Sequence, residues 1–466
     1  MFSPAMLLNA PRPSIAHSPM CASARAPFSV LLCVVVALPS CRPGGTARDA
    51  PRINPHPIAL HRPKRQPLSA AAQLGRELFF DPALSASGRM SCGSCHAANA
   101  AYGPPDSKAV QLGGLAGDAQ GGRAVPSLRY LSRIPNFEIG PDTTGEEPLD
   151  MNARAAQAAG APPAQKKAGA RAAPPLVPRG GLFWDGRSNT LQDQARGPLF
   201  NPAEMANTDV SAVAARLARA PYAARFTQLF GAQIFSDARR SVDEALFAIA
   251  RFQFEDESFQ PYSSKYDAYL EGKAELTSPE ARGLRLFEDP ARANCAGCHP
   301  SRPGPDGQPP LFTDHQYEAL GVPRNEQLLV NRDPAYFDLG LCGPVRGDLQ
   351  SQRQYCGMFN TPTLRNAARR GVFFHNGVYH SLAEVVEFYN GRDLHPERFY
   401  PRGNDGAVLP FNDLPPACRG NVDKLDAPFN RRAGDRPPLD AEEIRELIAF
   451  LETLNDGYVA SDAPAP

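Results

Sequence analysis

The chain has 466 residues, a length that suggests two or three domains with substantial cores. Lysine plus arginine and aspartate plus glutamate each number 49, so no charge excess indicates a nucleic-acid partner or a basic membrane surface. Proline (49) and glycine (38) exceed what is usual in a tight helical bundle, which favours long ordered loops.

The amino terminus is typical of an export signal. An apolar run from Phe28 to Leu38, too short to span a bilayer, ends in Leu-Pro-Ser-Cys41. Because this ending is that of a bacterial lipoprotein signal, we expect residues 1–41 to hold a lipoprotein-type signal peptide that is cleaved before Cys41, so that Cys41 carries the lipid. The mature protein is then periplasmic and anchored to a membrane. An ordinary secretory signal with a chance cysteine is the alternative, and a start at Met20 stays open.

One sequence module occurs twice after a proline- and arginine-rich stretch, 42–66, that we interpret as a tether. The segment 74–82 has apolar residues at helical spacing, ends in Asp-Pro, and leads to Cys92-Gly93-Ser94-Cys95-His96. The same pattern returns at 282–290 and leads to Cys295-Ala296-Gly297-Cys298-His299. We therefore expect two related domains.

Both Cys-x-x-Cys-His motifs predict a covalently attached c-type haem. Two thiols three positions apart can reach both vinyl groups of a porphyrin, and the next residue brings an imidazole to the iron. Zinc ligation and dithiol exchange are the competing interpretations of the cysteine spacing. The adjacent histidine in both copies favours haem. We call the group expected at Cys92, Cys95 and His96 haem 1, and that at Cys295, Cys298 and His299 haem 2.

The remaining sequence predicts a mainly α fold of two cytochrome c-like domains with long loops. Helical patterns recur at 209–219, 240–253 and 440–455, where Asp440 is a good N-cap with Glu443 three residues later. An Ala/Pro/Gly-rich stretch, 142–180, is interpreted as a mobile surface insertion. The expected parts are an N-terminal haem domain, a C-terminal haem domain and a tail, at 67–275, 276–458 and 459–466.

Three cysteines remain outside the signal and the haem motifs: Cys342, Cys356 and Cys418. An oxidising compartment favours a disulfide between Cys342 and Cys356, the nearest pair. Three buried free thiols are the alternative.

Haem 1 has no obvious distal ligand in the sequence. No histidine lies between His96 and His299, Met151 lies in the predicted insertion, and Met205 lies in a proline-containing turn. A vacant position on iron allows peroxide to bind, whereas a filled one favours electron transfer. We therefore expect catalysis at haem 1, with a lysine, a tyrosine or a residue from the other domain as alternative ligands.

Several motifs in one order resemble the bacterial di-haem cytochrome c peroxidase and MauG family over residues 67–456. Besides the haem motifs, they are FWDGR (183–187), LQDQARGPLFNPAEM (191–205), NTPTLRN (360–366) and FFHNG (373–377). The resemblance implies that Trp184 lies between the haems and that Gln194 and Glu204 line the peroxide pocket. Cleavage of the O–O bond needs a proton moved between the oxygens, which suits Glu204 as general acid/base. Taken alone, these three would be a core aromatic, a helix-surface amide and a loop carboxylate.

At haem 2 the resemblance implies a ligand fourteen residues after His375, which is Tyr389. The peroxidases have methionine there and MauG-like members have tyrosine. An anionic phenolate favours oxidised iron, so haem 2 is expected to store oxidising equivalents. The alternative ligand is Met358, and His375 is expected to support the haem by hydrogen bonding.

The family also holds a calcium ion between its haems with an asparagine side chain and backbone carbonyls. The matching residue here is Ala124, so the resemblance leaves calcium in doubt: only the carbonyls of Arg370 and Val372 would remain.

These features predict a peroxidase that reduces hydrogen peroxide at haem 1 with electrons from a small cytochrome c or cupredoxin. The alternatives are a MauG-like enzyme that oxidises aromatic residues of a protein substrate and a non-catalytic di-haem electron carrier. No nucleic-acid partner is expected.

Overall fold

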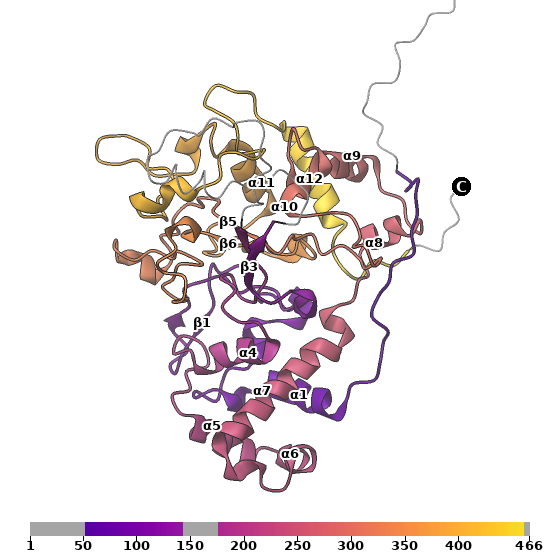
Figure 1. Ribbon diagram of the computed structural model, residues 1–466, viewed down its shortest axis with the longest axis vertical. Helices are drawn as coiled ribbons and strands as arrows, with labels where there is room; N and C mark the ends of the chain where they lie inside the picture. The colour runs from indigo at the N-terminus through magenta and orange to yellow at the C-terminus, as the bar shows by residue number, and fades with distance from the viewer. Residues whose placement is uncertain (1–51, 143–175, 461–466) are drawn as a thin grey trace, which may run out of the picture. The chain divides into compact units, whose positions relative to one another are not determined.

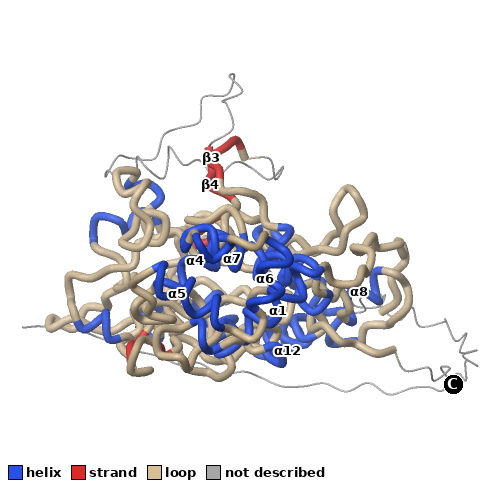
Figure 2. The backbone as a smooth tube through the Cα atoms, turned by 90° about the horizontal axis from the view of Figure 1, so that it is seen from below, coloured by secondary structure: helices blue, strands red, loops and turns tan. Residues whose placement is uncertain are grey.

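The computed structural model describes residues 52–142 and 176–460, and these are mainly α-helical with short strands and long loops (Figures 1 and 2). The predicted signal peptide and most of the predicted insertion and tail lie outside the described residues. The α-helices are α1 (Ala70–Phe80), α2 (Cys92–Cys95), α4 (Leu191–Phe200), α5 (Val210–Arg219), α6 (Ala223–Phe230), α7 (Ala238–Glu255), α8 (Lys265–Leu270), α9 (Ser278–Glu288), α10 (Cys295–Cys298), α11 (Leu382–Gly391) and α12 (Ala441–Glu452).

The strands of the described residues form three antiparallel pairs. They are β1 (Leu112–Gly113) with β2 (Ala119–Gln120), β3 (Glu138–Pro141) with β4 (Leu176–Arg179), and β5 (Tyr317–Glu318) with β6 (Phe359–Asn360). Such short strands cannot form an independent sheet, so helix packing and loops hold the described fold together.

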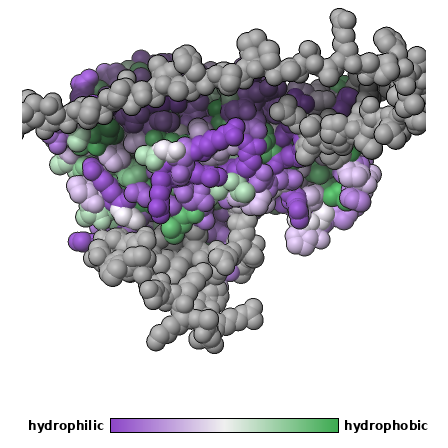
Figure 3. Space-filling view, turned by 90° about the horizontal axis from the view of Figure 1, so that it is seen from above, coloured by the Kyte–Doolittle hydropathy of each residue, from purple (hydrophilic) through white to green (hydrophobic). Residues whose placement is uncertain are grey.

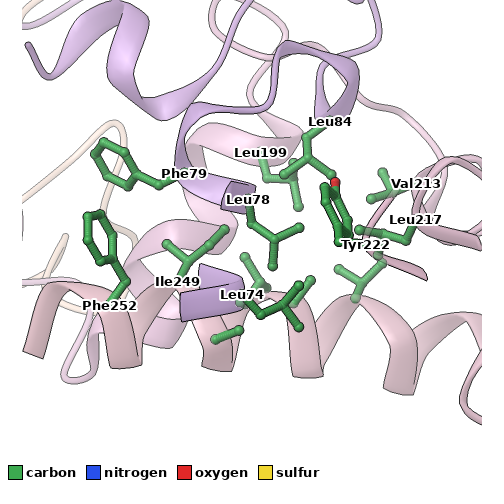
Figure 4. Close-up of a cluster of buried hydrophobic side chains, with 14 of the residues drawn as sticks. Leu74, Leu78, Phe79, Leu84, Leu199, Val213, Leu217, Tyr222, Ile249 and Phe252 are labelled. Carbon is green, nitrogen blue, oxygen red and sulfur yellow. The ribbon is translucent and has the colours of Figure 1, made fainter. Parts of the chain in front are cut away.

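The first hydrophobic core is built around α7, which lies against α1, α4 and α5 (Figure 1). Asp237 caps α7 by accepting a hydrogen bond from the amide of Arg240. Gly75 lets α1 approach closely, because a Cβ atom there would lie 1.8 Å from the carbonyl oxygen of Ala248. Figure 4 shows apolar side chains of several elements meeting there, among them Leu74, Leu78, Phe79, Val213, Leu217, Ile249 and Phe252.

The second core repeats this arrangement with α9 packed on α12. Gly283 occupies the position in α9 that Gly75 has in α1, and a Cβ atom there would lie 1.9 Å from the carbonyl oxygen of Glu446. The predicted cap of α12 is confirmed, since the Asp440 side chain accepts from the amide of Glu443. The sequence repeat therefore encodes the same close helix crossing twice.

Three segments belong to other parts of the fold than the expected division into tether, domains and insertion gave them. Residues 52–66, expected to be a tether, pack on the second core: Leu60 is buried there, and Arg62 donates to the Glu271 carboxylate at 2.6 Å. Helix α8, expected in the first domain, also belongs to the second core, where Tyr266 contacts Phe450 edge to face. Strand β4, from the end of the predicted insertion, pairs with β3. Apolar and aromatic side chains inside polar stretches explain these differences.

The predicted Cys342–Cys356 disulfide is confirmed, and Cys418 is a buried free thiol. On the face drawn in Figure 3, the described residues in view are mostly hydrophilic, with apolar ones in small patches. No helix within residues 52–142 and 176–460 is long and apolar enough to cross a membrane.

Candidate active site

The two Cys-x-x-Cys-His motifs have the same local geometry. In each, the cysteines lie on one face of a single helical turn, α2 or α10, and the histidine follows as its C-cap. The Nδ1 of His96 donates to the carbonyl oxygen of Tyr102 at 3.0 Å, and that of His299 to Phe312 at 2.8 Å. Each Nε2 is thereby left for a metal ion, as in haem ligation by histidine.

Burial suits both histidines to iron binding. It lowers the pKa of His96 and that of His299 to about 4, although the hydrogen bonds to the backbone carbonyls oppose this effect. Both imidazoles are therefore neutral near pH 7, which is the form that ligates a metal.

A cavity of about 250 Å³ opens beside α10 and is lined by Cys295, Cys298 and His299. Its other walls carry mainly apolar side chains, among them Phe287, Phe374, Leu382, Val386 and Leu447. An apolar hollow beside two thiols and a neutral imidazole suits a porphyrin, so the residues present fit a haem at this position.

Tyr389, on α11, lines the same cavity as the second Cys-x-x-Cys-His motif. Its ring contacts that of Phe374 at a centroid distance of 6.2 Å and that of Phe429 at 5.2 Å. Met358, the alternative ligand, is 1% exposed and lies in a different apolar cluster, around the Cys342–Cys356 disulfide.

His375 also lines this cavity and is buried. Its ring stacks on Phe359 with centroids 3.6 Å apart, and its Nε2 lies 3.5 Å from Oδ2 of Asp413. That nitrogen makes no hydrogen bond to any described residue, so it has a donor or acceptor site to offer a bound group.

On the haem 1 side, Gln194 is buried on α4, and Glu204 lies in the turn that follows this helix. Asn201 fixes the turn: its Nδ2 donates to Oε1 of Glu204 at 2.5 Å. Burial raises the pKa of Glu204, while Asn201 and Arg187 partly offset this. No hydrogen bond joins the side chains of Gln194 and Glu204 in the described part of the chain.

Glu204 lies close to the first haem motif. Burial, and after it the charge of the Glu204 carboxylate, raises the pKa of the Cys95 thiol to about 11. The structure therefore brings a carboxylate with a raised pKa toward the thiols that were expected to attach haem 1.

Trp184 is buried and lines the cavity beside α10. Its Nε1 donates to the carbonyl oxygen of Ala124 at 2.8 Å, and its own carbonyl accepts from the amide of Asn360 at 3.0 Å. The amide of Ala124 in turn donates to the carbonyl of His375 at 2.7 Å. Trp184 and His375 are thus both hydrogen-bonded to the backbone of the same loop residue, Ala124.

The sequence did not predict an ion-pair network that involves Asp185, the residue after Trp184. The fully buried Asp185 accepts from Nη1 of Arg123 at 2.7 Å, and Arg123 also donates twice to Asp338, at 2.6 and 2.8 Å. The sequence signal that could have indicated this network is the aspartate of the FWDGR motif, which is Asp185. Asp338 is 215 residues from Arg123 along the chain, and no local pattern marks it.

The residues at the expected calcium position do not fit a calcium ion. Nη2 of Arg370 donates to the carbonyl oxygen of Val125 at 2.9 Å, and Nε donates to that of Val372 at 3.3 Å. The guanidinium places a positive charge beside these carbonyl oxygens, and this charge disfavours a cation at the same position. Within the residues that the structure describes, no group of three or more His, Cys, Asp or Glu could hold a metal ion.

The fold and these sites define a haem-dependent oxidoreductase, and comparisons with known proteins give the family. A family model described as di-haem cytochrome c peroxidase matches residues 69–275. The methylamine utilization protein MauG of Paracoccus denitrificans is 32% identical over 396 residues, which cover 83% of this chain and 89% of that protein. The cytochrome c551 peroxidase of Nitrosomonas europaea is 29% identical over 317 residues, covering 68% and 71%.

Solved structures agree with this result. The diheme peroxidase BthA from Burkholderia thailandensis E264 has 35% identity and a TM-score of 0.69, covering 88% of this chain and 92% of that one. The chain belongs to the di-haem cytochrome c peroxidase and MauG family. It is a peroxidase-type oxidoreductase with haem as its cofactor, as the sequence predicted.

Proposed function

We propose that the chain is a periplasmic peroxidase with two covalent haems c, in which hydrogen peroxide is reduced on the His96 side and oxidising equivalents pass to the His299 side. Bound haem supplies an iron that binds peroxide and exchanges electrons. The observation that carries the proposal is the asymmetry of the two sites. Glu204 lies near Cys95, whereas Tyr389 lines the cavity of Cys295 and Cys298.

Glu204 acts as the proton carrier in this proposal. As a carboxylate it would accept a proton from one oxygen of hydrogen peroxide and return it to the other, which leaves as water. Because burial raises the pKa of Glu204, the carboxyl group binds this proton more tightly than an ordinary glutamate would between the two transfers. Two electrons, passed through the haems from the donor, and two further protons would reduce the remaining oxygen to a second water. Gln194 orients the peroxide, and Trp184 lies on the route between the two sites.

Tyr389 would hold haem 2 as a protein ligand of its iron, and His375 would support that haem by hydrogen bonding. The cavity lining supports both roles, because both side chains border the space beside Cys295 and His299. A phenolate on the iron would stabilise its oxidised state and suit this site to storage.

Spectra of the ferric holoprotein test the proposal. We expect a high-spin signal from haem 1, a low-spin signal from haem 2, and a spectral change on addition of hydrogen peroxide. An electron carrier with two six-coordinate haems instead predicts two low-spin signals and no response to peroxide. That second result would exclude the peroxidase.

A second candidate function is the MauG-like oxidation of aromatic residues on a partner protein. Tyr389 at the position of the peroxidases' methionine favours it, whereas the peroxidase version takes electrons from a small cytochrome c or cupredoxin. Mass spectrometry of candidate partners after peroxide treatment distinguishes the two. Oxidised tryptophan or tyrosine favours the MauG-like reaction, and oxidised donor haem or copper without such products favours the peroxidase.

Lipid attachment at Cys41 is proposed for the mature chain, although this residue lies outside the described residues. Mass spectrometry of the mature N-terminus checks it. A diacylglyceryl cysteine at position 41 is expected, and an unmodified terminus would contradict the anchor.

A further inference from the structure

Arg370 is a partly buried cation without an acidic partner among the described residues. It follows the short helical turn Ala367–Arg369 and reaches out of the C-terminal half of the described chain to the loop that contains Val125. No carboxylate pairs with it in the described residues, unlike Arg123 and Arg365, which bind Asp338 and Asp267. A buried charge is costly unless something offsets it.

Backbone carbonyls hold two of the three guanidinium nitrogens. Nη2 donates to Val125 at 2.9 Å, and Nε donates to Val372 at 3.3 Å. Nη1 makes no hydrogen bond to any residue that the structure describes. It lies beside Gly103, where an added Cβ atom would come within 3.2 Å of it.

These contacts lie between the two haem sites. Val125 follows Ala124, whose carbonyl accepts the hydrogen bond of Trp184. Gly103, beside Nη1, follows Tyr102, whose carbonyl accepts from Nδ1 of His96. Val372 directly precedes Phe373 and Phe374, which line the haem 2 cavity. The guanidinium therefore bridges segments that border both sites.

The guanidinium keeps its charge in this position. Burial lowers the pKa of Arg370 to about 10, which leaves the group protonated throughout the physiological range.

We propose that Arg370 is a built-in cation that takes the place of a metal ion between the two haem sites, with Nη1 free to bind a haem propionate. Haem brings two carboxylates into a protein, and one of them would satisfy both the unpaired N–H groups and the buried charge. The proposal depends on haem binding, which family membership implies, and not on the proposed roles of Glu204 or Tyr389.

Metal analysis of the purified holoprotein is the first test. We expect less than a stoichiometric amount of calcium and no change in the absorption spectrum of either haem on treatment with the chelator EGTA. About one calcium ion per chain, together with a chelator-sensitive spectrum, would overturn the proposal.

Redox titration of variants is the second test. Arg370→Gln should shift the midpoint potential of at least one haem to more negative values, because loss of a nearby positive charge favours oxidised iron. Arg370→Lys, which keeps the charge, should recover most of this shift. Arg369→Gln is the matched control: it removes an exposed positive charge one residue away and should leave both potentials close to those of the wild type.

Equal potentials in the wild type and Arg370→Gln would contradict the proposal, as would equal shifts in Arg370→Gln and Arg369→Gln. If Arg370→Gln fails to take up haem, the comparison of Arg370→Lys with the wild type and the metal analysis still decide the matter. None of these measurements uses peroxide, so a failure here is distinct from a failure of the proposed peroxidase reaction.

Discussion

The indole Nε1 of Trp184 donates a hydrogen bond of 2.8 Å to the carbonyl oxygen of Ala124. The amide of Ala124 donates to the carbonyl oxygen of His375, so the only tryptophan of the chain is joined to the wall of the haem 2 cavity through one loop residue. The orientation of the indole therefore depends on a backbone contact as well as on packing.

Trp184→Phe keeps an aromatic ring and removes this hydrogen bond. We expect a loss of roughly 1–2 kcal/mol in the free energy of unfolding, because a buried carbonyl loses its donor. We also expect slower spectral changes at haem 2 after peroxide addition in stopped-flow experiments. Tyr317→Phe is the control, since it removes a buried 2.6 Å bond to Gly180. An equal slowing in both variants would contradict a specific role for Trp184.

Asp185→Asn weakens the buried network of Arg123 and Asp338. Without the charge of Asp185, the positive charge of Arg123 is only partly neutralised in a buried position. We therefore expect a loss of about 3 kcal/mol in the free energy of unfolding. Denaturant unfolding measures it. Asp348→Asn breaks a pair whose acid is 62% exposed and should cost less than about 1 kcal/mol. Similar losses in both variants would show that the network adds no more than a surface pair.

Glu204 gives peroxide turnover a characteristic pH dependence. Its ionised form accepts the first proton, and burial raises its pKa, so activity should fall with decreasing pH already above the range of an ordinary glutamate. Glu204→Gln should lose about 100-fold or more in turnover. It should also lose this acidic limb of the pH profile.

The control for this variant is Glu257→Gln, whose parent side chain is 60% exposed and which should keep both the rate and the profile. Since the raised pKa means that the fold disfavours the ionised carboxylate, Glu204→Gln should not be less stable near pH 7. An acidic limb that persists unchanged in Glu204→Gln would remove this residue from the mechanism.

Tyr389→Phe removes the phenol oxygen and keeps the ring that packs on Phe374 and Phe429. If Tyr389 ligates haem 2, the low-spin signal of that haem should change in Tyr389→Phe. The thermal stability of the variant should stay close to that of the wild type. Electron paramagnetic resonance measures the signal. Met358→Leu should leave the spectrum as in the wild type. The reverse pattern would make Met358 the ligand.

The two glycines at the helix crossings should not tolerate alanine. In Gly75→Ala and Gly283→Ala the new methyl group meets a backbone carbonyl oxygen at 1.8 and 1.9 Å, so the helices must separate. We expect each to cost about 3 kcal/mol in the free energy of unfolding. At Gly121 the nearest atom is 3.6 Å away, and Gly121→Ala should change stability by less than about 0.5 kcal/mol.

Local sequence was enough to predict the features that depend on neighbours in the chain. The spacing of Cys92, Cys95 and His96 defines a single helical turn, and Asp440 with Glu443 defines a helix start. The repeated module predicted two related domains, and each of the two cores contains one copy of it, in α1 and in α9. In the haem motifs and the helix cap the interacting groups lie within a few residues of each other, where backbone geometry leaves few alternatives.

Tertiary structure alone decided the environment of the two haem motifs. Arg370 lies 245 residues from the Val125 carbonyl that holds it, and Arg62 is 209 residues from Glu271. The sequence by itself determined that two Cys-x-x-Cys-His sites exist and which family they belong to. Only the folded chain decided that a guanidinium lies between them and that residues 52–66 pack on the second core, because contacts between distant segments depend on shape and burial, which no local pattern records.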